Sequence, residues 1–197
     1  MHMKANFEPL PETYPFTPAQ YLRMSEQGLF SGDRVELLNG GIIPVAAQGM
    51  HHSATIDELR DQLVRIFGAG FWVRTQSTLD LAPHGVPDPD VAVILGDRRA
   101  PAKQLPRHAM LVVEVSESTL THDRTRKASL YASCGILDYW IVNIADSQLE
   151  IRRDPQPDST QEFHYGYTSL TTLRPGANAT PLAAPHGIIP VESLFFS

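Results

Sequence analysis

Two acidic residues stand where a β-strand would normally carry apolar side chains. Asp90 opens the apolar run Val91–Leu95 directly after Pro89, and Glu114 interrupts the run Leu111–Val115. Burying an isolated carboxylate costs several kcal/mol, so each must be paired, hydrogen-bonded or bound to a cation. Carboxylates on neighbouring strands repel each other unless a cation lies between them, and such oxygen ligands suit Mg²⁺ or Mn²⁺. The structural alternative is that Asp90 caps a turn and Glu114 pairs with an arginine.

A basic residue, Lys127, follows these two acidic residues in the sequence. Lys127 comes thirteen residues after Glu114, in the helix expected to leave the second strand. Arg124 and Tyr131 lie at i−3 and i+4 from it, on the same face of a regular helix. A lysine folded back over the strand end can orient a water and stabilise charge developing on a phosphate. Alternatively, Lys127 is simply exposed, and Glu36, in an earlier strand, faces solvent.

Helices and turns must position these residues. Thr17-Pro18 resembles an N-cap followed by proline at the first helical position, which predicts a helix to about Gly28. Asn39-Gly40 between two apolar runs predicts a two-residue hairpin, because both turn positions favour positive φ. Apolar residues at helical spacing predict a second helix over residues 51–67, which would bury one stripe.

Strand patterns dominate the rest of the chain. They cover residues 71–81, 90–95 and 110–115, and the last is apolar enough for the centre of a sheet. Thr121 is expected to cap a helix that ends near Cys134, before Gly135. Further strands are expected at 137–143, 148–152 and 162–168, with a closing segment at 182–196. These elements predict an α/β domain with a mixed central β-sheet flanked by helices.

Length and composition limit the class of protein. The 197 residues fit an N-terminal arm, 1–16, and a single domain, 17–197. The one cysteine, Cys134, excludes an internal disulfide and any multi-cysteine metal site. We expect a cytoplasmic protein with no membrane partner and no organic cofactor, because the chain shows no signal peptide, no apolar run of about 18 residues and no glycine-rich phosphate motif.

Charge is distributed unevenly. The net charge of −6 argues mildly against a protein that coats nucleic acid, since affinity for phosphate backbones comes from clustered Lys and Arg. Residues 98–127, however, carry seven basic and three acidic side chains. This segment predicts either a basic face that contacts DNA or an ordinary solvated surface. The candidate DNA-contacting residues are Arg98, Arg99, Arg124 and Arg126.

Five segments in order resemble the Uma-two family of restriction endonucleases, part of the PD-(D/E)XK nuclease superfamily. The similarity covers roughly residues 18–153 and is carried by the order of the segments more than by any one of them. They are the residues 34–43 (RVELLNGGII), His52 at a helix start, residues 86–93 (VPDPDVAV), residues 111–119 (LVVEVSEST) and residues 123–142 (DRTRKASLYASCGILDYWIV).

The resemblance implies a role for each matching residue. Asp90 and Glu114 would bind the metal ion, with the Val115 carbonyl as a further ligand. Lys127 would replace the usual superfamily lysine, because Ser116 stands at that lysine's position. Glu36 matches an early acidic residue that helps to hold metal or water.

Three further residues match positions around such a site. His52 matches the family's helix-opening histidine, and Gln76 falls near a polar position on the strand before Asp90. Tyr131 is expected to pack against or orient Lys127. The implied catalytic set therefore remains Glu36, Asp90, Glu114 and Lys127, with these three around it.

The implied fold is a restriction-endonuclease-like core with an added N-terminal helix and C-terminal strands. The implied activity is hydrolysis of DNA phosphodiester bonds with Mg²⁺, or Mn²⁺ in its place, by a homodimer that presents two sites. The rival interpretation is a homodimer that keeps the nuclease fold but binds nucleic acid or protein without cutting. The acidic balance and Ser116 favour this rival.

Overall fold

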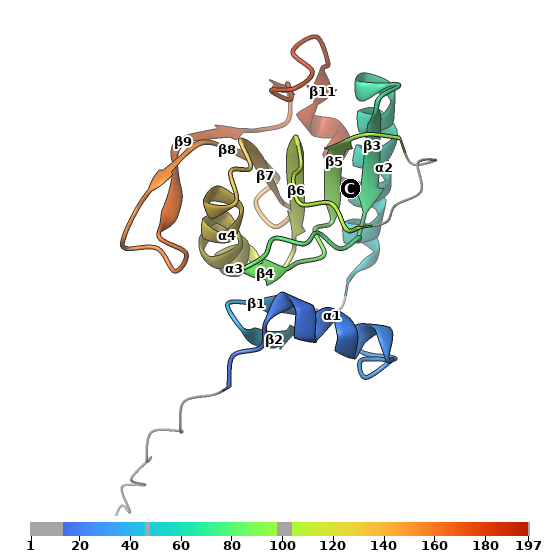
Figure 1. Ribbon diagram of the computed structural model, residues 1–197. Helices are drawn as coiled ribbons and strands as arrows, with labels where there is room; N and C mark the ends of the chain where they lie inside the picture. The colour runs from blue at the N-terminus through green and yellow to red at the C-terminus, as the bar shows by residue number, and fades with distance from the viewer. Residues whose placement is uncertain (1–13, 46–47, 98–103, 197) are drawn as a thin grey trace, which may run out of the picture.

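A six-stranded mixed sheet forms the centre of the protein in the computed structural model, which describes residues 14–45, 48–97 and 104–196 (Figure 1). Its strands, in spatial order, are β3 (Phe71–Thr75), β5 (Val91–Leu95), β6 (Leu111–Ser116), β7 (Asp138–Asn143), β8 (Gln148–Pro157) and β9 (Tyr165–Leu173). β6 and β7 run parallel and the other neighbours antiparallel. The expected α/β class and mixed sheet are therefore confirmed.

A hairpin near the N-terminus forms a second, smaller sheet. β1 (Val35–Leu38) pairs with β2 (Gly41–Pro44) on one side and with β4 (Gly85–Val86) on the other. Asn39 has φ 49° and Gly40 has φ 77°, as the predicted hairpin turn requires. A Cβ at Gly40 would also lie 2.6 Å from the Cβ of Pro15, so the turn is closed to larger residues.

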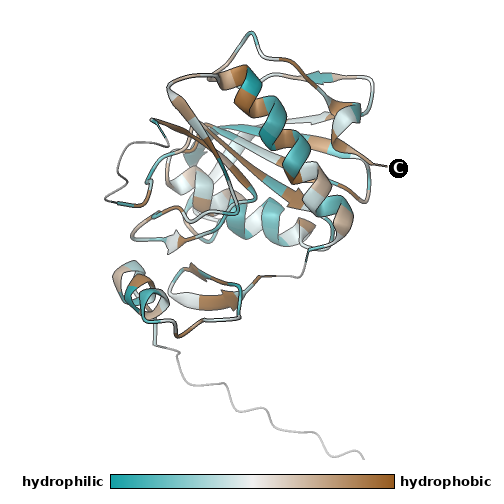
Figure 2. Ribbon diagram, turned by 90° about the vertical axis from the view of Figure 1, so that its right-hand side faces the viewer, coloured by the Kyte–Doolittle hydropathy of each residue, from teal (hydrophilic) through white to brown (hydrophobic). Residues whose placement is uncertain are grey.

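Two helices confirm their sequence signals. α1 (Pro18–Glu26) begins at a capping box in which Thr17 and Gln20 satisfy each other's backbone N–H groups. α2 (Met50–Phe67) covers one face of the large sheet. Figure 2, which has α2 in front, shows hydrophobic and hydrophilic positions alternating along it. The apolar positions face the sheet, as a helix with one buried stripe requires.

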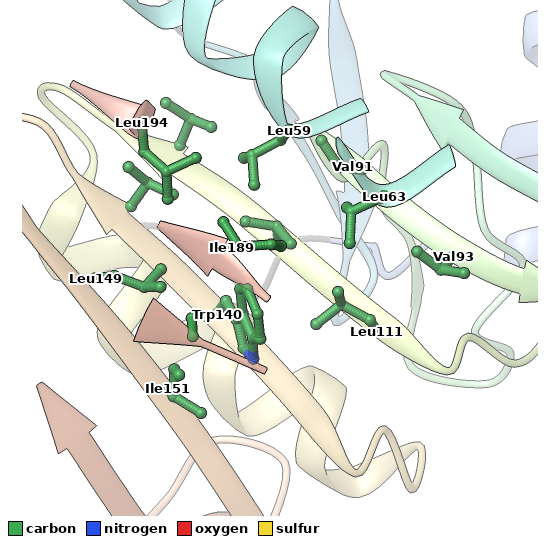
Figure 3. Packing of buried hydrophobic residues seen from close by; sticks show 14 of the residues in the cluster. Leu59, Leu63, Val91, Val93, Leu111, Trp140, Leu149, Ile151, Ile189 and Leu194 are labelled. Carbon is green, nitrogen blue, oxygen red and sulfur yellow. The ribbon is translucent and has the colours of Figure 1, made fainter. Parts of the chain in front are cut away.

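The hydrophobic core lies on both faces of the large sheet. On the α2 face, the C-terminal segment adds β10 (Asn178–Ala179), β11 (Ile189–Pro190) and the 3₁₀ turn η2 (Val191–Leu194). Figure 3 shows this face, with Leu59, Leu63, Val91, Val93, Leu111, Trp140, Leu149, Ile151, Ile189 and Leu194. The opposite face packs against the helix between β6 and β7. Alternate residues of each central strand therefore pack into the core on opposite faces of the sheet.

The connection from β6 to β7 is not one regular helix. It consists of α3 (Leu120–His122), a π-helical turn η1 (Asp123–Lys127) and α4 (Ala128–Ser133). The helix starts after Thr119, so the expected cap at Thr121 is wrong, and no side chain caps this end. The expected stop is confirmed, since Gly135 has φ 72° just beyond the helix.

Three expected strand boundaries are wrong. The strand predicted over 71–81 ends at Thr75, because Gln76 leaves the extended conformation with φ 46°. β8 continues to Pro157, beyond the predicted end at 152, because β9 pairs with it as far as Pro157. β9 correspondingly begins at Tyr165 and ends at Leu173, later than predicted. Most of the predicted N-terminal arm, residues 1–13, lies outside the described residues.

Within residues 14–45, 48–97 and 104–196, no helix is long and apolar enough to cross a bilayer.

Candidate active site

The four residues predicted to be catalytic meet in one pocket. Glu36 comes from β1, Asp90 from the residue before β5, Glu114 from β6 and Lys127 from the end of η1. All four line a cavity of about 90 Å³, together with His52 from α2. Segments separated by up to 91 positions in the chain are thus brought to one place.

Glu114 reaches the pocket because of strand alternation. Its neighbours Val113 and Val115 belong to the core cluster on the α2 face, so Glu114 points to the opposite face, toward η1 and α4. Its Oε1 accepts hydrogen bonds from Lys127 Nζ at 3.0 Å and from Tyr131 Oη at 2.6 Å. The Tyr131 hydroxyl and the Lys127 ammonium therefore share one Glu114 oxygen, and the expectation that Tyr131 packs against or orients Lys127 stays a prediction.

Lys127 is a buried cation, with only 5% of its surface exposed, so the alternative of an ordinary exposed lysine is wrong. Its Nζ lies 2.9 Å from Glu36 Oε1 and 3.0 Å from Glu114 Oε1. Glu36 is itself buried, not solvent-facing, and also accepts the Asp88 N–H at 2.9 Å. Because both faces of β1 are covered, the alternation of side chains along the strand does not leave Glu36 exposed to solvent.

The π-helical turn explains how Lys127 and Arg124 diverge. Residues at i−3 share a face only while each turn holds 3.6 residues, and a π-turn holds more. Arg124 accordingly reaches Glu150 on β8, whereas Lys127 enters the pocket. The expected shared face of Arg124, Lys127 and Tyr131 is thus wrong for Arg124. Turns of this kind occur frequently at functional sites.

Asp90 is held by three partners. Its Oδ2 accepts the Val115 N–H at 2.8 Å and lies 3.2 Å from His52 Nε2. Its Oδ1 accepts a bond from Gln48 at 3.3 Å, and Gln48 in turn accepts one from Gln76 at 2.6 Å. His52 therefore contacts Asp90 directly, whereas Gln76 is linked to Asp90 through Gln48.

Burial dominates the electrostatics of the pocket. It raises the pKa of Glu114 to about 8, an effect opposed by the Lys127 ammonium and reinforced by Asp90, Asp123 and Glu36. Burial alone would lower the pKa of Lys127, but the Glu114 and Glu36 carboxylates raise it above its ordinary value. Burial next to Glu114 also raises the pKa of Tyr131, so its hydroxyl remains a donor. The pocket therefore combines a fixed cation with a surplus of carboxyl groups.

Several pocket residues were missed from the sequence. Asp88, Asp123, His122 and Arg34 all line the cavity. Asp88 had a local signal in the repeated Pro-Asp of residues 87–90, and Asp123 precedes Lys127 by four residues, one helical turn. Burial raises the pKa of both carboxyls, although a hydrogen bond from Thr78 to Asp88 and one from Thr119 to Asp123 oppose the rise. Arg34 and His122 had no signal beyond their residue types.

Comparison with known proteins shows the family to which the chain belongs. The model of the Uma2 family, described as "Putative restriction endonuclease", matches residues 18–188. The chain belongs to the Uma2 family. A search of curated proteins gave no match. The chain is also similar to a solved structure described as a "putative nuclease belonging to DUF820" from Anabaena variabilis, with a TM-score of 0.67 and 14% identity over 91% of this chain and 97% of that one.

Membership of Uma2 supports a nuclease, and restriction-endonuclease-like families generally use a divalent metal. Among the described residues, no three His, Cys, Asp or Glu side chains are grouped as ligands for a metal ion. Mg²⁺, however, needs only one or two protein carboxylates, with waters and substrate phosphate completing its coordination. Asp90 and Glu114 provide two. Burial raises the pKa of Glu114, and a nearby cation would favour its ionised form. The donor set therefore fits a Uma2 metal site.

Two of the four arginines expected to contact DNA are paired with carboxylates outside the pocket of this Uma2 protein. Arg124 pairs with Glu150, and Arg126 pairs with Glu162 at 3.0 Å and donates to the Leu38 carbonyl. Neither arginine lines the pocket. Arg98 and Arg99 lie outside the described residues. The sequence-based assignment of these four to DNA thus stays a prediction.

The pair of Glu150 with Arg124 gives a pH-dependent contribution to stability. Burial alone would raise the pKa of Glu150, but hydrogen bonds and charge from Arg124 and Arg152 lower it below its ordinary 4.5. A carboxyl with a lowered folded pKa stabilises the protein above its unfolded pKa and loses that effect as pH falls through the folded value. We expect Glu150→Gln to be less stable than wild type at pH 7, with the difference narrowing below pH 4.5. Urea unfolding across this range measures it, and a pH-independent difference would contradict it.

Proposed function

We propose that this Uma2 protein is a metal-dependent endonuclease that hydrolyses DNA phosphodiester bonds. The observation that carries the proposal is the meeting of Asp90, Glu114 and Lys127 in one pocket. The pattern of two carboxylates and an ammonium group matches what phosphoryl chemistry requires, namely ligands for a cation and a fixed positive charge.

In this proposal, the residues on β6 and before β5 would bind the metal ion. Asp90 and Glu114 would hold Mg²⁺ or Mn²⁺. The carbonyl of Val115, which follows Glu114 on β6, is the predicted third ligand. When bound, the metal would supply positive charge to the scissile phosphate and lower the pKa of a water. The Asp90 and Glu114 carboxylates are already held in place by hydrogen bonds before any substrate binds.

Lys127 supplies the fixed cation. Held between Glu36 and Glu114, its Nζ needs no reorganisation to stabilise negative charge developing on a phosphate or to orient an attacking water. Tyr131 Oη restrains the Glu114 carboxylate, and the Val115 N–H and His52 restrain that of Asp90. Glu36 acts on Lys127 and on the backbone of Asp88.

The alternative is a nuclease-fold protein, also proposed as a homodimer, that binds nucleic acid or protein without cutting. One observation favours it: the three described arginines of residues 98–127 are paired with Asp80, Glu150 and Glu162 and leave little free positive charge. Ser116, at the usual lysine position, is also buried and contacts Thr119 at 3.4 Å.

The first test uses the unaltered protein. With Mg²⁺ or Mn²⁺ we expect nicking or linearisation of plasmid DNA that a chelator stops, and calorimetric binding of the metal that Glu114→Gln weakens. Asp61→Asn is the matched control, because Asp61 lies exposed on α2 in a pair with Arg60. Absence of both metal binding and cleavage at millimolar metal would favour the non-cutting alternative.

A further inference from the structure

Arg34 differs from the other cation at the candidate active site. Among the described residues that line the pocket, six are acidic and only two, Lys127 and Arg34, carry a permanent positive charge. The acidic residues are Glu36, Asp88, Asp90, Glu114, Glu117 and Asp123. Lys127 is held between two of these carboxylates. Arg34 is exposed just before β1, and in the described ranges no carboxylate oxygen lies within 4.0 Å of its guanidinium group.

A DNA strand would need this second cation. Every nucleotide carries a phosphate, so the phosphates next to the scissile one also approach the acidic surroundings of the pocket. A metal ion at Asp90 and Glu114 would offset charge at the scissile phosphate but not at its neighbours. A guanidinium group presents N–H donors in a fork that matches the oxygens of a phosphate. Arg34 is therefore available for a phosphate beside the one that is cleaved.

A second cavity adjoins the pocket at Arg34. It has a volume of about 330 Å³ and lies between α1 and the start of β1, which Figure 1 shows beside each other; we call it the α1 hollow. Arg34 and Asp88 line both the pocket and the α1 hollow. Burial raises the pKa of Asp88 and the charge of Arg34 opposes the rise, so the two groups are close. A chain that passes Arg34 on leaving the pocket therefore reaches the hollow.

The lining of the α1 hollow suits the uncharged part of a nucleotide. Asp33 and Asp88 would repel a phosphate inside it, but carboxylates accept hydrogen bonds from the amino groups of nucleobases. Phe30 and Tyr21 also line the hollow, and their rings stack with 5.4 Å between centroids. Aromatic side chains of this kind pack well against flat bases. The volume lies at the lower end of the roughly 300–1,000 Å³ of small-ligand pockets.

We propose that Arg34 binds the phosphate next to the scissile one and that the α1 hollow receives the unpaired nucleotide attached to that phosphate. This arrangement rests on the proposed function and deepens it, because it names the class of substrate. A base inside a duplex is stacked and cannot enter a cavity, and leaving the stack costs least for a base that is already unpaired. The preferred substrate is therefore DNA with an unpaired nucleotide beside the bond that is cut.

The first test removes the cation. On a short duplex with one unpaired nucleotide, Arg34→Gln should raise KM about tenfold with little change in kcat or in calorimetric Mg²⁺ affinity, because Arg34 contacts the substrate away from the breaking bond. A neutral methylphosphonate in place of one of the two phosphates that flank the mapped cut should remove the difference between Arg34→Gln and wild type. Arg174→Gln is the matched control, since Arg174 is exposed and lines neither cavity.

The second test fills the α1 hollow. Wild type should cut the duplex with the unpaired nucleotide about tenfold faster than the fully paired duplex, because unpairing costs a few kcal/mol. Ser25 lies exposed on α1 and lines the hollow, so Ser25→Trp should slow cleavage of the first duplex about tenfold without changing Mg²⁺ affinity. Ser159→Trp, at an exposed position between β8 and β9, is the matched control and should cut like wild type.

Several results would overturn this arrangement. They are an unchanged KM in Arg34→Gln, a difference from wild type that persists with a methylphosphonate at either flank, equal cleavage of the two duplexes, and normal cleavage by Ser25→Trp. A wild type that cuts no DNA contradicts the proposed function instead, and fluorescence anisotropy with the same DNA in Mg²⁺ then replaces KM. Binding about tenfold weaker in Arg34→Gln would uphold the phosphate contact, whereas equal or absent binding would overturn it.

Discussion

Lys127→Met is expected to lower the free energy of unfolding by about 3–5 kcal/mol and the rate of DNA cleavage by at least about 100-fold. The ammonium group contacts Glu36 and Glu114 in a pocket where all three side chains are almost fully buried. Without it, two carboxylates remain buried with no cation between them. Urea unfolding followed by tryptophan fluorescence measures the stability, and plasmid nicking, below the temperature at which the variant unfolds, measures the activity.

A double variant separates the structural role of Lys127 from its catalytic role. Lys127→Met with Glu36→Gln removes a negative charge along with the positive one, so part of the stability should return. The glutamine oxygen can still accept the Asp88 N–H. Cleavage should not return, because no cation faces the phosphate. If both folded variants cleave DNA like the wild type, the proposed role of Lys127 is wrong.

A surface variant shows that the effect belongs to the pocket. Arg60→Met removes a cation from an exposed pair with Asp61, in which both side chains are about half exposed or more. Exposed pairs contribute roughly 0–1 kcal/mol, so this variant should resemble the wild type in stability and cleavage. A comparable loss from Arg60 would mean that the stability of Lys127→Met does not report on burial.

Local chemistry made parts of this fold predictable. The Asn39-Gly40 turn, the N-cap at Thr17 and the apolar stripe of α2 each follow from interactions within a few residues, and each is confirmed. Strand ends were less predictable, because they depend on the partner strand. β8 extends to Pro157 only because β9 lies beside it.

The site shows the same division between local and long-range information. Glu114 and Asp90 were visible because a carboxylate in an apolar strand is costly wherever it lies. The burial of Glu36 was not visible, since alternation assigned it to solvent and only the packing of β1 against the site shows otherwise. The π-turn was also invisible, because no residue type specifies it, yet it sends Lys127 and Arg124 to different carboxylates.

A carboxylate at the start of an apolar strand does not always mark the candidate active site, and Asp138 is an example. This residue opens the apolar strand β7 much as Asp90 opens β5, and it is fully buried. It lines no part of the pocket. Its Oδ1 accepts bonds from Trp140 Nε1 and Arg153 Nε, both at 2.8 Å, and its Oδ2 accepts the Leu182 N–H at 2.8 Å. Asp138 thus ties β7 to β8 and to the C-terminal segment.

Asp138→Ala should therefore destabilise the fold by about 3–5 kcal/mol. The substitution leaves the Trp140 N–H, the Leu182 N–H and the Arg153 guanidinium without their acceptor, although Arg153 keeps a bond to the Thr180 carbonyl at 2.7 Å. Asp138→Asn should cost less, because it retains one oxygen. Adding Arg153→Met to Asp138→Ala should recover part of the loss, because it removes the half-buried charge that has lost its carboxylate partner. Urea unfolding of the four proteins, wild type included, measures these differences.

The decisive comparison is between Asp138→Asn and Asp90→Asn, which make the same chemical change at the start of two apolar strands of the same sheet. The Asp138 variant should be less stable but should nick plasmid DNA at the wild-type rate per folded molecule. The Asp90 variant should fold and fail to nick, since Asp90 faces the pocket beside Glu114. If the two variants lose cleavage in proportion to their stability alone, the Asp90 carboxylate has only a structural role, and the assignment of the pocket to hydrolysis fails with it.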